Sequence, residues 1–289
     1  MKLTAVVAAA VLSLSTGLAV ADDASVAKQG KTTERAVVLD FGALDTLDAL
    51  GLQASVVAVP RQGLPEYLSQ YDDERYADAG GLKTPNVETI AKLSPSLVLM
   101  TSRSGEHREA LEEITTVVDV SMGTDTDYLT AFDANIRKLA ERFGAGEQAE
   151  KKLKELHDKV SKARAEAPKE AKVLVATHND GRLMLNKHPV VYQVLQLPEP
   201  VLPPSVKSEK RGERVFTPLS VEAIQEIKPA VLLVVDRSAA IGGEPLNPES
   251  LQKSLGGTKV KVLSPALWYL SGGGLQSLSL QIDEVVEAL

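Results

Sequence analysis

Short runs of consecutive apolar residues alternate with helix-patterned stretches along most of the chain. A strand without polar alternation is typical of a parallel sheet that is covered on both faces. We therefore predict an α/β protein in which helices flank central parallel sheets. The apolar runs that predict strands cover residues 36–41, 56–59, 97–100, 116–120, 171–176, 231–235 and 260–263.

The most helical pattern lies near the middle of the chain, at Glu147–Glu166. Leu153, Leu156, Val160 and Ala163 form a narrow apolar stripe with helical spacing, and the other faces are charged. Such a helix can rest on two lobes along one side. We predict two Rossmann-like lobes, over residues 35–143 and 169–289, joined by one long bridging helix over residues 144–168.

An internal repeat supports this division. The segment Val87–Arg103, VETIAKLSPSLVLMTSR, aligns without a gap with Val221–Arg237, VEAIQEIKPAVLLVVDR. Each copy predicts a helix, a proline that ends it, a buried strand and then an arginine. The two copies are too far apart in the chain for a solenoid, so they indicate two similar lobes.

The arginines that end the two copies are the main candidates for chemistry. Ligands of open α/β sheets bind beyond the carboxyl ends of the strands, where Arg103 and Arg237 lie. Arginine stays charged and offers a planar set of donors, so two arginines facing one cleft predict an anionic ligand. The alternative is that each arginine caps a helix or forms a surface ion pair of small energetic value.

Each copy also has an acid, Glu88 or Glu222, in the first turn of its helix. The helix dipole favours an acid there, which is one explanation. The other is that the two acids dock onto basic pockets of a partner protein. The sequence does not separate these two explanations.

The chain begins with a pattern typical of a secretory signal peptide. Lys2 precedes an uncharged apolar stretch over residues 4–18, and Ala19-Val20-Ala21 is a small-residue cleavage site. We predict a signal peptide over residues 1–21, a flexible leader over 22–34, and location in the periplasm. The chain has no cysteine and a formal net charge of −7, so thiolate metal sites and nucleic acid are not expected.

Few other motifs predict chemistry. The histidines have no spacing typical of a metal site, and no nucleophile–base motif is present. We therefore expect a protein that is not an enzyme and has no intrinsic cofactor or catalytic residue. Trp268 and Tyr269 are adjacent aromatic residues in a predicted glycine-rich loop after a strand. Trp268 suits the core, and Tyr269 is the better candidate for a ligand contact.

These features resemble the periplasmic substrate-binding proteins of iron–siderophore ABC importers, and most closely the binders of ferric catecholate (enterobactin-type) siderophores. The resemblance rests on VPRQGLPEYLSQY at 59–71, the two repeat segments, VVDR at 234–237 and WYLSGGGLQSL at 268–278. It implies the helical-backbone type of binding protein. It also implies a monomer that receives a ferric siderophore and delivers it to an inner-membrane ABC permease.

The resemblance assigns roles to particular residues. Arg103 and Arg237 would neutralise the ferric complex together with a third basic residue, for which this chain has Lys187. Trp268 and Tyr269 would complete the ligand site. The phenolate of Tyr269 would bind iron directly if the siderophore leaves iron sites open. Glu88 and Glu222 would be the acids that dock onto the permease.

The chain departs from the family pattern at one place. Relatives that bind tetradentate siderophores pair the tyrosine with a histidine, but SEKRGERVFTPLSVE contains none, and Arg211 or Arg214 lies there instead. This favours a ligand whose iron sphere is already filled and which is bound by charge. Haem or cobalamin would be the alternative ligands in the same class. A periplasmic enzyme on an α/β scaffold and a structural adaptor are the alternatives from other classes.

Overall fold

The structure is a computed structural model that describes residues 34–212 and 214–289. The predicted signal peptide, its cleavage site after Ala21 and nearly all of the predicted leader lie outside these residues. Within the described residues, no helix is both long and apolar enough to span a membrane.

The first half of the described chain forms a five-stranded, all-parallel sheet in the order β3-β2-β1-β4-β5. Its first strand is shorter than predicted, because Asp40 accepts a hydrogen bond from the backbone N–H of Ala43 and starts a helix there. The strands are β1 (Ala36–Val38), β2 (Val56–Val59), β3 (Ala77–Asp78), β4 (Leu97–Met100) and β5 (Thr116–Asp119). The helices are α1 (Phe41–Ala49), α2 (Val87–Lys92), α3 (Arg108–Glu112) and α4 (Tyr128–Arg142), with 3₁₀ turns η1 (Gln53–Ser55), η2 (Glu66–Tyr71) and η3 (Ser102–His107).

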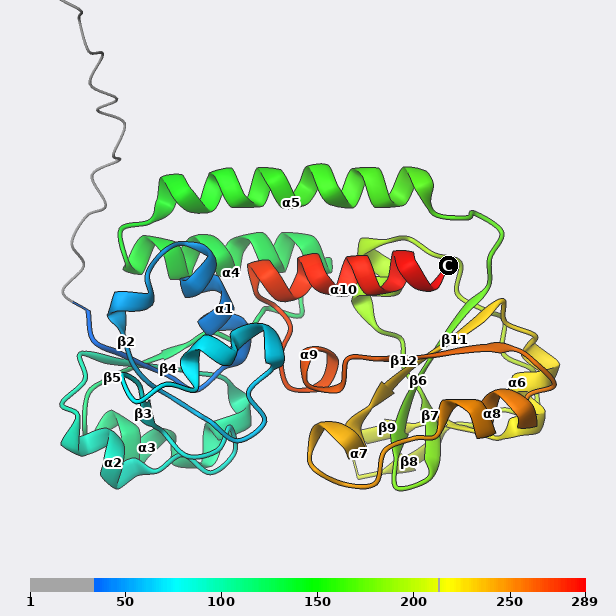
Figure 1. Cartoon of the computed structure of the whole chain (residues 1–289), viewed down its shortest axis with the longest axis horizontal. Helices are drawn as coiled ribbons and strands as arrows, with labels where there is room; N and C mark the ends of the chain where they lie inside the picture. The colour runs from blue at the N-terminus through cyan, green and yellow to red at the C-terminus, as the bar shows by residue number, and fades with distance from the viewer. Residues whose placement is uncertain (1–33, 213) are drawn as a thin grey trace, which may run out of the picture. The chain divides into compact units, whose positions relative to one another are not determined.

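Both faces of this sheet are buried, as the apolar runs predict. Leu97 and Leu99 of β4 pack in one cluster with residues of α1 and α4. Val98 and Met100 pack on the opposite face with residues of α2 and α3. Because neighbouring residues of a strand point to opposite faces, a continuous apolar run fills both layers. Figure 1 shows α2 and α3 on the far side of this sheet from α1 and α4.

The second half forms another five-stranded sheet, in the order β10-β7-β6-β11-β12. Its strands β6, β11 and β12 are parallel, whereas β7 and β10 pair antiparallel. The strands are β6 (Val173–Asn179), β7 (Arg182–Leu185), β10 (Pro218–Leu219), β11 (Val231–Asp236) and β12 (Lys259–Leu263), with a separate hairpin of β8 (Glu209–Arg211) and β9 (Arg214–Phe216). The helices are α6 (Val221–Ile227), α7 (Arg237–Ala240), α8 (Pro248–Ser254), α9 (Pro265–Tyr269) and α10 (Leu275–Ala288).

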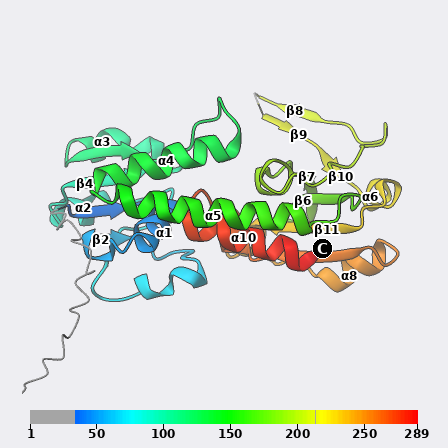
Figure 2. The same cartoon turned by 90° about the horizontal axis from the view of Figure 1, so that it is seen from above.

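One long helix, α5 (Gly146–Glu166), connects the segments that form the two sheets. Its apolar stripe is buried in one cluster with residues of α4 and α10. Figure 1 shows α5 running along α4 and α10, and Figure 2 shows the same arrangement from above, with the β8–β9 hairpin at the edge of the second half. Because α10 also packs against α1, the last helix contacts the first half of the fold.

One local prediction was wrong. Residues 265–269 are helix α9 and not part of a loop, since Pro265 occupies the first turn, where its missing N–H costs nothing. The segment before β8 contains a π-helical turn, η4 (Val190–Val194).

Candidate functional site

The two repeat arginines meet at one side chain, Tyr269. Arg103 lies in η3 after β4, and Arg237 begins α7 after β11, so both follow the carboxyl end of a central strand. The guanidinium carbons of Arg103 and Arg237 lie 5.7 and 5.5 Å from the centre of the Tyr269 ring. These distances are within the range of cation–π attraction. The predicted convergence of the two guanidinium groups is therefore present.

Each arginine also forms hydrogen bonds that fix its position. Arg103 donates from Nη2 to the backbone oxygen of Tyr269 at 3.0 Å. Arg237 donates from Nε to the Tyr269 hydroxyl at 2.8 Å and from Nη1 to Oδ1 of Asn179. Asn179 ends β6, the strand next to β11, so three strand ends supply this network. The remaining guanidinium donors are available to a ligand.

A cavity of about 280 Å³ opens beside this network, and we call it the arginine cavity. Lys83, Arg103 and Arg237 line it, and the described lining residues include no acid. The other polar lining groups include Gln62 and Tyr269. Three cations around a partly enclosed space focus the electrostatic field and favour an anionic occupant.

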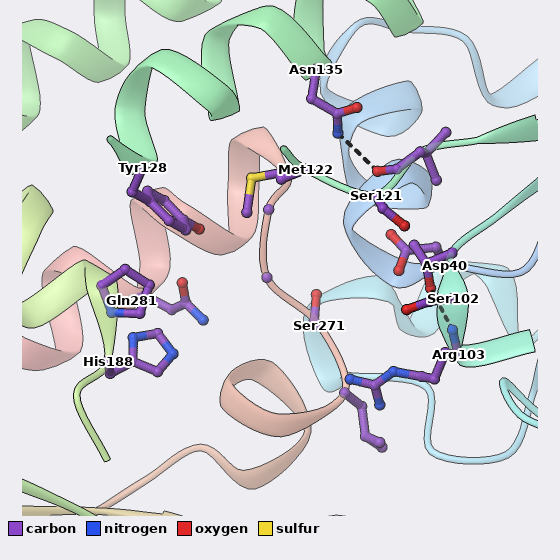
Figure 3. Close-up of a pocket in the computed structure, with 16 residues that line it drawn as sticks. Asp40, Ser102, Arg103, Ser121, Met122, Tyr128, Asn135, His188, Ser271 and Gln281 are labelled. Carbon is purple, nitrogen blue, oxygen red and sulfur yellow. Dashed lines mark hydrogen bonds between the residues drawn. The ribbon is translucent and has the colours of Figure 1, made fainter. Parts of the chain in front are cut away.

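A second cavity of about 380 Å³ adjoins the first and shares Arg103 and Leu270 with it. We call it the polar cavity, and Figure 3 shows the residues around it. Serine hydroxyls, amides and aromatic groups dominate its lining. It is lined by Asp40, Thr101, Ser102, Arg103, Val120, Ser121, Met122, Tyr128, Asn135, His188, Pro189, Leu270, Ser271, Gly272, Gly273 and Gln281.

Three lining residues of the polar cavity have shifted pKa values, and burial raises that of Tyr128. Burial raises the pKa of Asp40, although the hydrogen bond from Ala43 and the charge of Arg103 oppose this shift. Burial lowers the pKa of His188 to about 4, so its imidazole is neutral at pH 7. The backbone N–H of Val190 donates to Nδ1 of His188 at 3.3 Å, which leaves the ring proton on Nε2.

The loop after Tyr269 is held by close packing against α1. A methyl group on Gly42 would lie 2.1 Å from the backbone oxygen of Gly272. A methyl group on Gly274 would lie within 2.3 Å of the Asp45 carboxylate. The two glycines thus permit close contacts, with the Gly272 backbone and the Asp45 side chain, that a larger residue would prevent.

Asp45 of α1 strengthens this contact from the first half of the chain. Its carboxylate accepts hydrogen bonds from the backbone N–H groups of Gln276 (3.1 Å) and Ser277 (2.9 Å) at the start of α10. Tyr67 donates to Asp45 at 3.2 Å and contacts Ser271 at 2.5 Å between the two hydroxyl oxygens. Burial raises the pKa of Asp45 to about 7, against the effect of these donors. The loop that follows Tyr269 is thus anchored on α1.

Two predicted ligand residues lie elsewhere. Lys187 pairs with Glu199, its side chain is 63% exposed, and it lines neither of the two cavities. Trp268 is only 4% exposed, and it donates from Nε1 to Glu284 at 2.7 Å. Its ring packs edge-on against His188 with the ring centres 4.8 Å apart. In this structure Trp268 is therefore a core residue behind the site, because the helix α9 turns it inward.

The two predicted docking acids are exposed at equivalent positions. Glu88 and Glu222 lie in the first turns of α2 and α6. Glu88 pairs with Lys92 at 2.7 Å. The backbone N–H of Glu222 and the Ser220 hydroxyl lower the pKa of Glu222. Both acids are thus accessible to a partner.

Sequence reasoning missed Lys83, Asn179 and Gln281. Lys83 lies in the long polar segment before α2, and such a long loop inside a compact fold is itself a signal of function. Gln281 is a polar residue on the buried face of α10, which is also a recognisable signal. Among the histidines, His188 lines the polar cavity, whereas His178 is buried and pairs with Asp236 at 2.8 Å.

The described residues contain no group of three or more histidine, cysteine or acidic side chains that could hold a metal ion. The Tyr269 hydroxyl is an oxygen ligand candidate beside the cations of the arginine cavity. Its hydrogen bond from Arg237 leaves a lone pair on the phenolic oxygen. The site thus combines three cations with one phenolic oxygen.

The described residues thus combine two α/β halves, a long connecting helix and a cationic cavity at the strand ends. The chain belongs to the Periplasmic binding protein family, whose model matches residues 37–254. This family membership agrees with the helical-backbone fold predicted from the sequence.

Several relatives of known identity cover most of the chain. The petrobactin-binding protein YclQ of Bacillus subtilis is 32% identical over 273 residues, which cover 91% of this chain and 84% of the relative. The crystal structure of YclQ superposes with a TM-score of 0.79, covering 88% of this chain and 91% of YclQ at 29% identity.

The ferric-anguibactin-binding protein FatB of Vibrio anguillarum is 27% identical over 88% of this chain and 82% of its own length. The catecholate-siderophore binding protein VctP of Vibrio cholerae has the same fold, with a TM-score of 0.74 and 24% identity over 89% of this chain and 94% of VctP.

Proposed function

We propose that this chain binds a ferric siderophore, of the catecholate class, in the periplasm and delivers it to an inner-membrane ABC permease. The observation that carries this proposal is the convergence of Lys83, Arg103 and Arg237 on one cavity beside Tyr269. A ferric catecholate complex is anionic, and arginine forks match its oxygen atoms. The names of YclQ and FatB, which bind petrobactin and ferric anguibactin, also support it.

The chemistry of the donors agrees with this cargo. Ferric iron is a hard ion that prefers oxygen ligands, and the chain has no cysteine to compete for it. When the siderophore fills the iron sphere, the three cations bind the complex by charge. When iron sites remain open, the phenolic oxygen of Tyr269 is the group that would coordinate the iron.

We also propose roles for the segments around the site. Residues 35–143 and 169–289 act as the two lobes that enclose the ligand, and residues 144–168 act as their bridge. The exposed acids Glu88 and Glu222, one on each lobe, dock onto the permease. A helix bridge is stiffer than extended strands, so lobe movement on binding is small.

Fluorescence titration tests the proposed ligand. Trp268 is the only tryptophan of the chain, and it directly precedes Tyr269. We expect a ferric tris-catecholate complex to quench Trp268 emission in a saturable manner, with no saturable quenching by the iron-free chelator, haem or cobalamin. Saturable quenching by haem or cobalamin but not by the ferric complex would reject the siderophore assignment.

A further inference from the structure

The two copies of the repeat differ at the residue before the arginine. Ser102 precedes Arg103 and is exposed, whereas Asp236 precedes Arg237 and is buried. An ionised carboxyl group is costly to bury unless charged or polar partners surround it. The partners of Asp236 therefore decide whether its charge is compensated.

Both carboxylate oxygens of Asp236 accept hydrogen bonds. Oδ2 accepts the backbone N–H of Leu246 at 2.7 Å. Oδ1 accepts the backbone N–H of Ala239 at 3.1 Å, which caps α7, and lies 2.8 Å from Nδ1 of His178. Burial alone would raise the pKa of Asp236, but the hydrogen bonds from His178, Leu246 and Ala239 lower it, so the carboxylate is charged at pH 7. The acid thus fixes the start of α7, where Arg237 lies.

His178 is buried, and both of its ring nitrogens have partners. The backbone N–H of Gly181 donates to Nε2 at 3.1 Å, so this nitrogen carries no proton. The ring proton is therefore on Nδ1 and is donated to Asp236. A neutral His178 in this tautomer links the acid next to Arg237 with the turn that follows β6.

The turn after β6 is also tied to α7. Asp180 and Gly181 both have a positive φ, of 48° and 73°, as in the two-residue loop of a type I′ hairpin, here between β6 and β7. The backbone N–H of Asp180 donates to Oγ of the buried Ser238, in α7, at 2.9 Å. Asn179 directly precedes the turn, and its Oδ1 accepts from Nη1 of Arg237. The position of the turn thus sets where Asn179 meets the guanidinium group.

We propose that His178 is a positioning residue, which keeps Arg237 at the lining of the arginine cavity by joining Asp236 to the turn that contains Gly181. Without this link the turn and α7 can separate, and Arg237 loses the fixed acceptor Asn179. His178 itself lines neither cavity, so its effect on a ligand passes through Arg237. The effect of His178 on ligand binding rests on the proposed function, whereas its effect on the arginine does not.

Nuclear magnetic resonance tests the positioning without a ligand. The Nε–H of Arg237 donates to the Tyr269 hydroxyl at 2.8 Å, so its signal should exchange slowly with water, and Arg237→Gln identifies this signal by removing it. We expect His178→Leu to shift the signal and to speed its exchange by at least about tenfold, because the guanidinium group becomes mobile. Ser238→Ala, which removes only the bond to the turn, should give a smaller change in the same direction.

Ligand affinity gives a second measurement, followed by quenching of Trp268 with a ferric tris-catecholate complex. We expect His178→Leu to weaken binding about fivefold. In a protein that already carries Arg237→Gln, the same substitution should change the affinity by less than about twofold, because the residue through which His178 acts is gone. His157→Leu is the matched control. It removes another His–Asp pair, with Asp133, away from both cavities, and should leave the Arg237 signal and the affinity unchanged.

The outcomes separate the positioning role from the proposed function. An unchanged Arg237 signal in both His178→Leu and Ser238→Ala would overturn the positioning role. An equal loss of affinity with and without Arg237→Gln would overturn it too, since His178 would then act through the fold as a whole. Absence of ferric tris-catecholate binding by the wild-type protein would overturn the proposed function, while the resonance measurement still decides the role of His178. If His178→Leu does not fold, as judged by circular dichroism, Ser238→Ala carries both measurements.

Discussion

Arg103 and Arg237 occupy the same position of the repeated segment, yet they bind opposite ends of Tyr269. Arg103 donates to its backbone oxygen, and Arg237 donates to its hydroxyl group. Arg103 lines both cavities, whereas Arg237 lines the arginine cavity only. The duplicated segment thus supplies two cations at equivalent backbone positions. Tyr269, which lies outside the repeat, gives each arginine a different hydrogen-bond acceptor.

The similarity of the two copies extends to their backbones. Asn86 and Ser220 cap the two helices in the same way, each accepting an N–H three residues later. Ser94 and Lys228, at equivalent positions before the prolines, both have a positive φ, of 46° and 52°. Side chains other than glycine rarely adopt this conformation. The same left-handed turn thus joins helix to strand in both copies.

The surroundings of the two copies differ more. In the first half every strand of the sheet is parallel, whereas in the second half β7 and β10 run antiparallel beside β6. The loop that follows Tyr269 is anchored on α1 of the first half through Gly42 and Asp45. Similar sequence segments therefore do not imply equal contributions to the site.

The largest expected effect is on cellular uptake and concerns the two proposed docking acids, Glu88 and Glu222. Their substitution tests whether the two copies of the repeat contact the same partner. Glu88→Arg combined with Glu222→Arg should abolish uptake of a ferric catecholate by cells, with unchanged ligand affinity of the purified protein. Reversed charge would oppose basic pockets on the permease. Glu109→Arg with Glu249→Arg is the matched control, since these acids are also exposed in first helical turns. Normal uptake by the first double variant would remove the docking assignment.

The second-largest expected effect is on ligand affinity and concerns the two arginines. Arg103→Ala and Arg237→Ala should each weaken binding of a ferric catecholate by more than about tenfold, or ~1.4 kcal/mol. Arg103→Ala should have the larger effect, because Arg103 lines both cavities. Arg137→Ala removes an exposed pair with Glu150 and serves as the control. Unchanged affinity in both cleft variants, measured by quenching of Trp268, would exclude a charge-based site.

A smaller effect, on stability, is expected when the contact between α1 and the loop that follows Tyr269 is disturbed. Gly42→Ala places a methyl group 2.1 Å from the backbone oxygen of Gly272, so α1 and the loop must separate. We expect a loss of unfolding free energy of about 1–3 kcal/mol and weaker ligand binding. Gly123→Ala is the control, because nothing lies within 4 Å of its added methyl group. Equal thermal unfolding of the two variants would show that the contact is not tight in solution.

The smallest expected effect is a difference in ligand affinity between variants of Lys83 and Lys187. Lys83 lines the arginine cavity, and Lys187 pairs with Glu199 away from both cavities. Lys83→Ala should weaken binding of a ferric catecholate by about threefold or more at low ionic strength, and Lys187→Ala by less than about twofold. The reverse order would restore Lys187 as the third cation that the family resemblance implied.

Local patterns in the chain were sufficient for the buried central strands, the long helix, the repeat and the two strand-end arginines, but not for the short strands β3, β8, β9 and β10. These features depend on residues close in sequence, through side-chain periodicity, helix caps and prolines. The repeat added one long-range conclusion, because equivalent positions in two parallel sheets place equivalent side chains at the ends of strands. For this reason the amino-acid sequence alone is enough to pair Arg103 with Arg237.

The third cation, the burial of Trp268 and the partners of Tyr269 depend on contacts between distant segments. Lys83 rather than Lys187 reaches the arginine cavity, because the polar segment before α2 folds over the strand ends. Asp45 and Gln281 are ordinary polar residues in the sequence, and their importance comes from burial that only tertiary packing creates. The sequence supplies the polar groups, and the packing of α1, α9 and α10 decides which of them line the proposed ligand site.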